Sequence, residues 1–166
     1  MNSYQIVNYS SAYLEDLIKM VSLFRVTLDK FKRIDSKVDL DSARKEVIEY
    51  INNENKYRIY LSIVDNCAVG YIILRIDGVI WVEQIFVLEE YRRKGIAKAL
   101  YSASENYAKS IGEDTLYNYV HPNNDAIIAF LKSNDYTVLN LIEVRKKYKG
   151  EETKTTIKIA NNEFDY

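Results

Sequence analysis

The sequence predicts a mixed α/β fold, a single domain over residues 1–166 with its core at about residues 4–160. The expected elements follow the order β-α-α-β-β-β-α-β-α-β-β. Turn signals at Asp65-Asn66 and Asp77-Gly78 indicate that the central strands are joined as antiparallel hairpins. A strand–helix–strand crossover then follows, which makes the next strand a parallel neighbour. We therefore expect a mixed sheet with helices on both faces.

The N-terminal part contains one expected strand and two expected helices. Residues 4–9 form the strand, and Ser10 or Ser11 caps a helix over about residues 12–28. A charged connection at residues 29–40 leads to Asp41, which we expect to cap the helix from Ser42 to about Asn53. The residues expected on the inner faces are Leu14, Leu17, Ile18, Val21 and Phe24 in the first helix, and Ala43, Val47, Ile48 and Ile51 in the second.

The remaining elements are read from apolar periodicity and turn residues. Three strands are expected at residues 57–64, 68–76 and 79–88, and then a helix from about Ile96 that Gly112 ends. The rest of the chain reads as a strand at 115–120, a helix at 124–133, and two strands at 136–148 and 155–160 around the Lys149-Gly150 turn.

Composition excludes several classes of protein. The formal net charge of −1 argues against a general nucleic-acid binder, and no apolar run is long enough to span a membrane. Cys67 is the only cysteine and His121 the only histidine, so neither a disulfide nor a zinc site is expected, and no metal. The N-terminus lacks the pattern of a signal peptide, and we expect a cytoplasmic protein.

The most informative segment is the basic glycine loop at residues 92–98, between an expected strand and an expected helix. The first N–H groups of a helix have no partner within the helix and carry partial positive charge. Gly95 allows the backbone to approach a ligand, and the loop adds the cations of Arg92, Arg93, Lys94 and Lys98. These features suit a pyrophosphate.

The loop matches neither of the two commonest phosphate-binding motifs. There is no G-x-x-x-x-G-K-[ST] and no G-x-G-x-x-G, which argues against a P-loop ATPase and a dinucleotide fold. The pattern at Arg92–Ala97 is [RQ]-x-x-G-x-[GA]. Taken alone, so short a pattern is equally consistent with a basic turn before a surface helix.

Together with two longer segments, this loop resembles the GNAT family of acetyl-CoA-dependent N-acetyltransferases. Residues 83–92 look like the fourth strand of that family and its entry to the pyrophosphate loop. Residues 124–136, in which an Asn opens a helix that runs to a Tyr, are similar to its later signature. The element order extends the resemblance over nearly the whole chain.

The resemblance implies acetyl-CoA as co-substrate and a set of residues that bind it. The fourth strand of the family is bulged and splayed from the fifth, which frees backbone groups of the fourth strand for the pantetheine arm. The Val87 N–H would then donate to the thioester carbonyl, and Asn124 would reach the arm. The expected cofactor-binding residues are Phe86, Val87, Arg92, Arg93, Lys94, Gly95, Ile96, Ala97, Lys98 and Asn124.

Glu83 is the candidate general base, because some relatives use a Glu at this place to accept the amine proton through water. The alternative is a strand carboxylate that faces solvent or an Arg, and we expect Gln84 to point to the other face. Leu131 stands where a Tyr is usual, so no general acid is named. The possible substitutes are Tyr101, Tyr117, Tyr119 and Tyr136.

The predicted function is transfer of an acetyl group to a primary amine of a small molecule or a protein, by direct attack in a ternary complex. Cys67, expected far from Val87, would form no acyl-enzyme. His121 reads as a loop residue bonded to backbone, with a contact to the substrate as the alternative. An acyl-CoA-binding sensor and an interaction module of the same fold remain alternatives. We expect no nucleic acid and no membrane as partners, and a homodimer stays open. Acidic residues that could attract a cationic amine lie in the connection between the first two helices and at the expected cap of the second, at Asp29, Asp35, Asp39 and Asp41.

Overall fold

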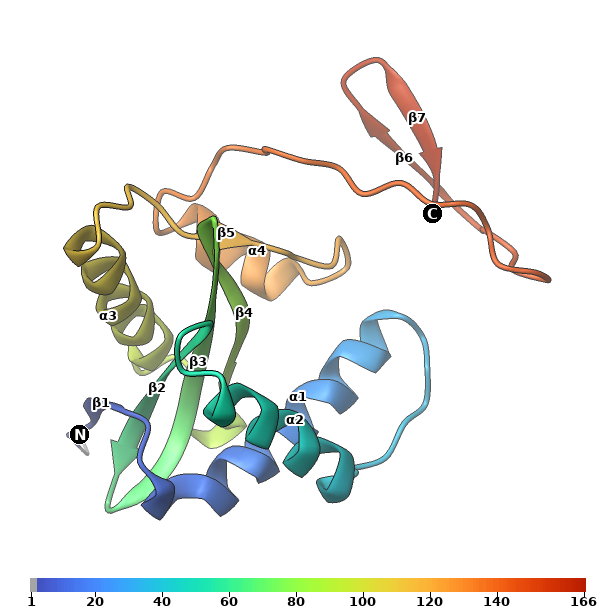
Figure 1. Ribbon diagram of the computed structural model, residues 1–166. Coiled ribbons are helices and arrows are strands. Elements are labelled where there is room, and N and C mark those ends of the chain that lie inside the picture. Colours follow the sequence, from blue (N-terminus) through green and yellow to red (C-terminus); the bar gives the residue numbers. More distant parts are fainter. Residues whose placement is uncertain (1–2) are drawn as a thin grey trace. The chain divides into compact units, whose positions relative to one another are not determined.

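A computed structural model describes residues 3–166, which divide into two compact units. Residues up to Asp135 form the first unit, and Tyr136–Tyr166 form the second. The first unit holds a five-stranded sheet in the order β1-β2-β3-β4-β5 with helices on both faces (Figure 1). The predicted mixed α/β fold is confirmed, while the single domain over the whole chain stays a prediction.

The sheet is antiparallel except at its last pair. Its strands are β1 (Gln5–Asn8), β2 (Tyr57–Val64), β3 (Cys67–Asp77), β4 (Val79–Val87) and β5 (Tyr117–Asn118). β5 runs parallel to β4, as the crossover predicts, but is shorter than the expected strand at 115–120. Asp65 and Asn66 both have positive φ, which is the backbone of a two-residue hairpin turn, so the first predicted hairpin is confirmed.

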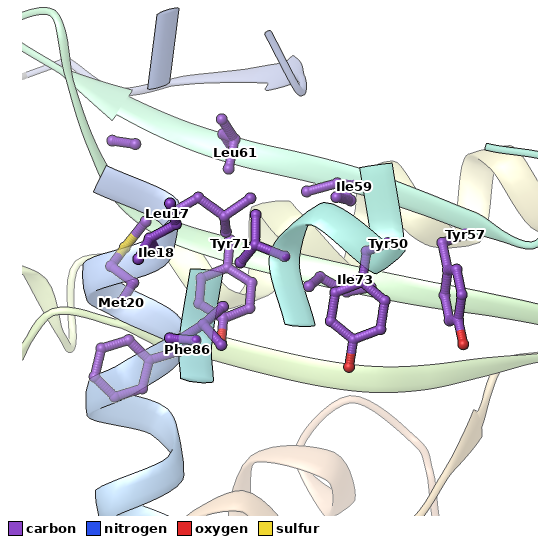
Figure 2. Packing of buried hydrophobic residues seen from close by; sticks show 14 of the residues in the cluster. Leu17, Ile18, Met20, Tyr50, Tyr57, Ile59, Leu61, Tyr71, Ile73 and Phe86 are labelled. Carbon is purple, nitrogen blue, oxygen red and sulfur yellow. The ribbon is translucent and has the colours of Figure 1, made fainter. Parts of the chain in front are cut away.

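Two helices cover one face of the sheet. Leu14–Phe31 forms α1, after a short 3₁₀ turn at Ser11–Tyr13 that the Ser10 side chain caps, and Leu40–Asn52 forms α2. Their apolar sides pack on β2, β3 and β4. Figure 2 shows the core at this face, with Leu17 and Ile18 of α1 and Tyr50 of α2 near Leu61, Tyr71 and Phe86 of the sheet.

Two details predicted for α2 are wrong. The cap is Asp39, whose carboxylate accepts from the Ser42 N–H at 2.9 Å, so the helix begins before Asp41. Ile48 is exposed, whereas Tyr50 is buried and its ring packs edge-on against Tyr57 at 4.7 Å. Because a tyrosine has an apolar ring and a polar tip, apolar periodicity gives Tyr50 too little weight.

The opposite face carries α3 (Ile96–Ser110), and α4 (Asp125–Lys132) packs against α3. The Arg58 guanidinium of β2 lies 4.1 Å from the centre of the Tyr107 ring of α3. The Tyr101 ring of α3 meets Phe130 of α4 edge-on at 5.1 Å. Gly112, at φ +87°, follows the end of α3 as predicted.

The second unit contains a two-stranded hairpin of β6 (Thr156–Ile159) and β7 (Asn162–Asp165). The strand predicted at 136–148 is wrong, because residues 136–155 contain no strand. The apolar residues that predicted it are exposed, from 48% for Ile142 to 88% for Val138. An apolar pattern makes a strand only where a neighbour pairs with the backbone, and β6 finds that neighbour in β7.

Candidate active site

A β-bulge in β4 places Glu83 out of the regular strand pairing. Ile73 and Leu74 are consecutive in β3, but they lie opposite Gln84 and Val82 of β4. Glu83 is therefore the extra residue, as expected where two residues of one strand oppose one of the other. The bulge that the resemblance implies is present, and it falls on the candidate base itself.

The β4 strand also separates from β5 at this point. β5 pairs with β4 only through Trp81↔Tyr117 and Val82↔Asn118. Beyond Val82, β4 continues to Val87 with β3 on one side and no described strand on the other. The residues from Glu83 to Val87 thus have an open edge, which is the splayed arrangement that the resemblance implies.

The backbone of Val87 points to that open edge. The Leu88 N–H donates to the Val69 carbonyl at 2.9 Å, so Leu88 and Val69 form a hydrogen-bonded pair across β3 and β4. Such pairs alternate along an antiparallel ladder. The N–H of Val87, opposite Gly70, must therefore face away from β3, as must that of Ile85. The N–H of Phe86, in contrast, points toward β3. Ile85 therefore takes the place of Phe86 among the residues with a free N–H at the open edge, and the sequence did not indicate Ile85.

The open edge leads to the basic glycine loop at the start of α3. Gly95 is the N-cap residue at φ +84°, and, being a glycine, it makes no side-chain capping hydrogen bond to the first turn of the helix. A Cβ at Gly95 would lie 3.2 Å from the Tyr4 hydroxyl, so both the positive φ and the limited space favour glycine here. First-turn amides that follow a glycine N-cap and lie beside cations fit a pyrophosphate group of CoA.

Two contacts hold this loop against the end of β4. The Arg92 Nε donates to the Val87 carbonyl at 2.9 Å, and its guanidinium lies over the Phe86 ring at 5.5 Å. Arg92 therefore orders the loop and contributes its charge from there. A Cβ at Gly70 would lie 3.2 Å from the Phe86 carbonyl and 3.3 Å from Ile96, so Gly70 permits the close packing of β3, β4 and α3. No pattern in the sequence indicated this role.

Glu83 pairs with Arg75 of β3. The Arg75 Nε donates to the Glu83 carboxylate at 2.9 Å, and its Nη1 donates to Asp77 at 2.6 Å. The Glu83 side chain keeps 32% of its surface exposed. The geometry is thus consistent with a general base and also with a strand carboxylate that faces solvent or an arginine. The Glu83 carboxylate is paired with Arg75 and remains accessible.

Gln84 lies on the same side of the sheet as Glu83, contrary to the expectation that it points to the other face. Its amide nitrogen donates to Glu46 of α2 at 2.5 Å and to the Tyr50 hydroxyl at 3.0 Å. Its amide oxygen accepts from the buried Tyr71 hydroxyl at 2.8 Å. The bulge explains the difference, because an extra residue breaks the alternation of side chains along β4.

Glu46 is the centre of this polar network, and Arg25 of α1 pairs with it. Burial raises the pKa of the Glu46 carboxyl, but hydrogen bonds from Arg25, Tyr50 and Gln84 outweigh burial and hold the pKa below its usual value. Burial, with the hydrogen bond to Glu46, raises the pKa of Tyr50, so this phenol stays protonated. The network consists of the Arg25–Glu46 ion pair and the neutral donors Tyr50 and Gln84. It joins α1 and α2 to β4 beside Glu83.

The loop before α4 contacts the end of α1. Asn124 caps α4 by accepting from the Ile127 N–H at 3.2 Å, which occupies its oxygen within its own helix. The His121 ring stacks on Phe31 at 6.1 Å, and its Nδ1 accepts from the Asn123 N–H at 3.2 Å. Burial and the nearby charge of Lys32 lower the pKa of His121. The prediction of a loop histidine bonded to backbone is confirmed.

Tyr101, one of the four possible general acids, is already committed to another contact, and the other three stay predictions. Leu131 is buried, and the Tyr101 hydroxyl donates to Asn118 at 2.7 Å in a buried position.

Cys67 is exposed and begins β3, at the same end of the sheet as Val87, because antiparallel pairing sets Gly70 opposite Val87. The expectation that Cys67 lies at the far end of the domain is therefore wrong.

The comparison that decides the family concerns the sequence of the first unit. The model of the acetyltransferase (GNAT) family matches residues 22–136, which is more than half of the chain. The chain belongs to the GNAT family. It is an enzyme of the acyltransferase class, and the predicted acyl-CoA chemistry is confirmed at the level of the family, whose co-substrate is acetyl-CoA.

Solved structures share the fold of this GNAT chain at low identity. An aminoglycoside 6'-N-acetyltransferase, AAC(6')-Ih from Acinetobacter baumannii, is 22% identical over 88% of this chain and 99% of its own, with a TM-score of 0.69. The PaiA N-acetyltransferase from Thermoplasma acidophilum, solved with coenzyme A, is 22% identical over 80% and 88%, with a TM-score of 0.68.

A third structure is AAC(6')-Iy in complex with CoA, which is 17% identical over 89% of this chain and 96% of its own, with a TM-score of 0.70. No curated protein matches the chain. In the described residues 3–166, no helix is long and apolar enough to cross a membrane. Nor does this part of the chain hold three or more His, Cys, Asp or Glu side chains placed to bind a metal.

Proposed function

We propose that this GNAT enzyme transfers an acetyl group from acetyl-CoA to a primary amine of a small molecule, by direct attack in a ternary complex. The observation that carries the proposal is the open edge of β4. It begins at the bulged Glu83, ends at Val87, and leads directly to the glycine loop at the start of α3.

Each part of this path has a chemical task. The first-turn amides of α3, with Arg93, Lys94 and Lys98, hold the pyrophosphate, and Arg92 fixes the loop to the Val87 carbonyl. The free N–H groups of Ile85 and Val87 pair with the pantetheine arm, and that of Val87 donates to the thioester carbonyl oxygen. Glu83 accepts the proton of the amine, and Arg75 orients its carboxylate.

The acceptor class is proposed from the face on which Glu83 lies and from the structural relatives. That face has α1, α2 and an accessible carboxylate, which suits a cationic amine. Among the structures of similar fold, several are named as aminoglycoside acetyltransferases, and one complex contains sisomicin. These relatives support an amino sugar as acceptor, and the cytoplasmic location and the homodimer stay predictions.

The test is release of free CoA thiol from acetyl-CoA in the presence of amines. Neamine, spermidine, glucosamine and an N-terminal peptide form the panel, and a matched set of hydroxyl compounds without amines forms the control. We expect thiol release and an N-acetyl product with at least one small amine. Retention of acetyl-CoA without transfer to any amine would instead favour the acyl-CoA sensor.

A further inference from the structure

Three aromatic rings stack at the point where β4 and β5 separate. The Trp81 ring of β4 lies parallel to that of Tyr119, with centroids 4.5 Å apart and planes 8° apart. The Tyr117 ring of β5 lies 5.3 Å from Trp81 at a tilt of 48°. We call Trp81, Tyr117 and Tyr119 the aromatic shelf.

The shelf is on the face of the sheet that carries α1 and α2. Tyr57, which packs on Tyr50 of α2, lies directly opposite Arg75 in β3. Arg75 lies opposite Trp81, and its guanidinium is 5.6 Å from the centre of the Trp81 ring. Residues that oppose each other across a sheet share a face, and so do residues two apart in a strand. The shelf and Glu83 are therefore on one side.

The shelf is accessible, although aromatic rings are usually placed to be covered. Tyr119 keeps 64% of its surface exposed, and Trp81 and Tyr117 are both half-buried. The rings are nevertheless held in a defined stack by one another and by Arg75. A fixed, exposed aromatic surface beside a reaction centre is suited to binding the flat side of a ring.

The charges beside the shelf favour a cation. Arg75 contributes one positive charge, and its partners Asp77 and Glu83 contribute two negative charges, so this cluster has an excess of one negative charge. Asp77 is 66% exposed on its side chain, so it can pair with a second cation as well. Trp81 and Glu83 are two positions apart, or about 7 Å along the strand.

We infer that the aromatic shelf is a subsite for a ring of the acceptor, an amino sugar whose apolar C–H face stacks on the exposed face of Tyr119 that is turned away from Trp81, while its ammonium pairs with Glu83 or Asp77. This inference rests on the proposed function, because it names the acceptor of that same site. A linear polyamine can pair with the carboxylates but has no ring that could stack on the aromatic shelf. The shelf should therefore raise the affinity for amines that carry a ring over the affinity for linear amines.

The chain supplies its own probe, because Trp81 is the only tryptophan. Fluorescence of the full chain is titrated with neamine and with spermidine, without acetyl-CoA. We expect neamine to change the emission in a saturable way, and Tyr119→Ala to weaken its binding by about 5–10-fold, the range for one lost aromatic contact. Tyr148→Ala, at an exposed tyrosine of the second unit, is the matched control and should bind as the unaltered chain does.

Calorimetry with the same ligands extends the test to spermidine, whose affinity should not change in Tyr119→Ala. Tyr119→Phe keeps the ring and should restore neamine affinity, which separates stacking from damage to the fold. Equal neamine affinity in Tyr119→Ala and Tyr148→Ala, or no binding of neamine by the unaltered chain, would overturn the subsite. Because no step of this test uses acetyl-CoA, its outcome is independent of whether transfer occurs.

Discussion

The proposed cofactor loop and the proposed acceptor face lie at opposite ends of the open edge of β4, and they are built in different ways. The loop, residues 92–98, is one short segment whose amides and cations are local. The acceptor face takes Arg25 from α1, Glu46 and Tyr50 from α2, Arg75 from β3 and Glu83 from β4. A ligand that a whole family shares can be bound by the backbone of one short segment. The substrate of one individual enzyme is bound by side chains from residues that are far apart in the sequence.

The largest effect is expected at the loop. Gly95→Asp places a side chain against Tyr4, a strained backbone at φ +84°, and a negative charge beside the phosphates. We expect CoA affinity, measured by calorimetry, to fall by more than about 100-fold, since each 1.4 kcal/mol is tenfold. Gly112→Asp, at φ +87° with open space around it, is the control for backbone strain and should bind CoA normally. Unchanged affinity in Gly95→Asp would remove the cofactor from this loop.

At the acceptor end, Glu83→Gln should lower kcat by about 100-fold, mainly at low pH, where the amine most needs a base. The measurement is a pH–rate profile with the best amine from the panel. Asp77→Asn, which alters the other carboxylate on Arg75, is the matched control: because Asp77 is assigned to acceptor binding and not to proton transfer, this variant should raise KM and change kcat much less. If the profile of Glu83→Gln matches that of the unaltered chain, the base lies elsewhere.

The polar network should contribute to stability as well as to the site. Gln84→Leu leaves the Tyr71 hydroxyl buried without its acceptor and deprives Tyr50 and Glu46 of a donor. We expect the free energy of unfolding, from urea titration, to fall by about 2 kcal/mol. Gln5→Leu, at an exposed position of β1, should have almost no effect. A similar loss in both variants would mean that the network adds little.

The Glu46 carboxyl predicts a pH dependence of stability. Its pKa is lowered in the folded protein, so its contribution is present above the unfolded value of about 4.3 and is lost as the pH falls through the folded value. Glu46→Gln should therefore show a shallower loss of stability on acidification below about pH 4 than the unaltered chain. The exposed Glu49→Gln on the same helix is the control, and equal slopes in all three would contradict the assignment.

The smallest effect is expected at Cys67. Cys67→Ala should keep full activity, because direct attack needs no acyl-enzyme, even though the thiol begins β3 at the same end of the sheet as Val87. The measurement is steady-state kinetics on the reduced protein. A folded but inactive Cys67→Ala would point to a covalent intermediate.

The difference between features made by neighbouring residues and features made by distant residues also explains what could be predicted from the sequence. The hairpin at Asp65-Asn66 and the glycine loop depend on neighbouring residues, so both were predicted where they occur. The side taken by Gln84 depends on a bulge, and a bulge arises only when two strands pair. The missing strand at 136–148 has the same cause: its apolar alternation is plain, but its pairing is not encoded locally.

The central claim is that the open edge of β4 holds the thioester arm, and amide hydrogen exchange of Val87 tests it most directly. Phe86 is the internal reference, because its N–H faces β3 with or without ligand. Adding acetyl-CoA should slow exchange at Val87 and Ile85, and at Ile96 to Lys98 in the first turn of α3, while Phe86 stays as it was. Slower exchange in that turn with no change at Val87 and Ile85 would contradict the account, because the cofactor would then bind the loop without lying along β4.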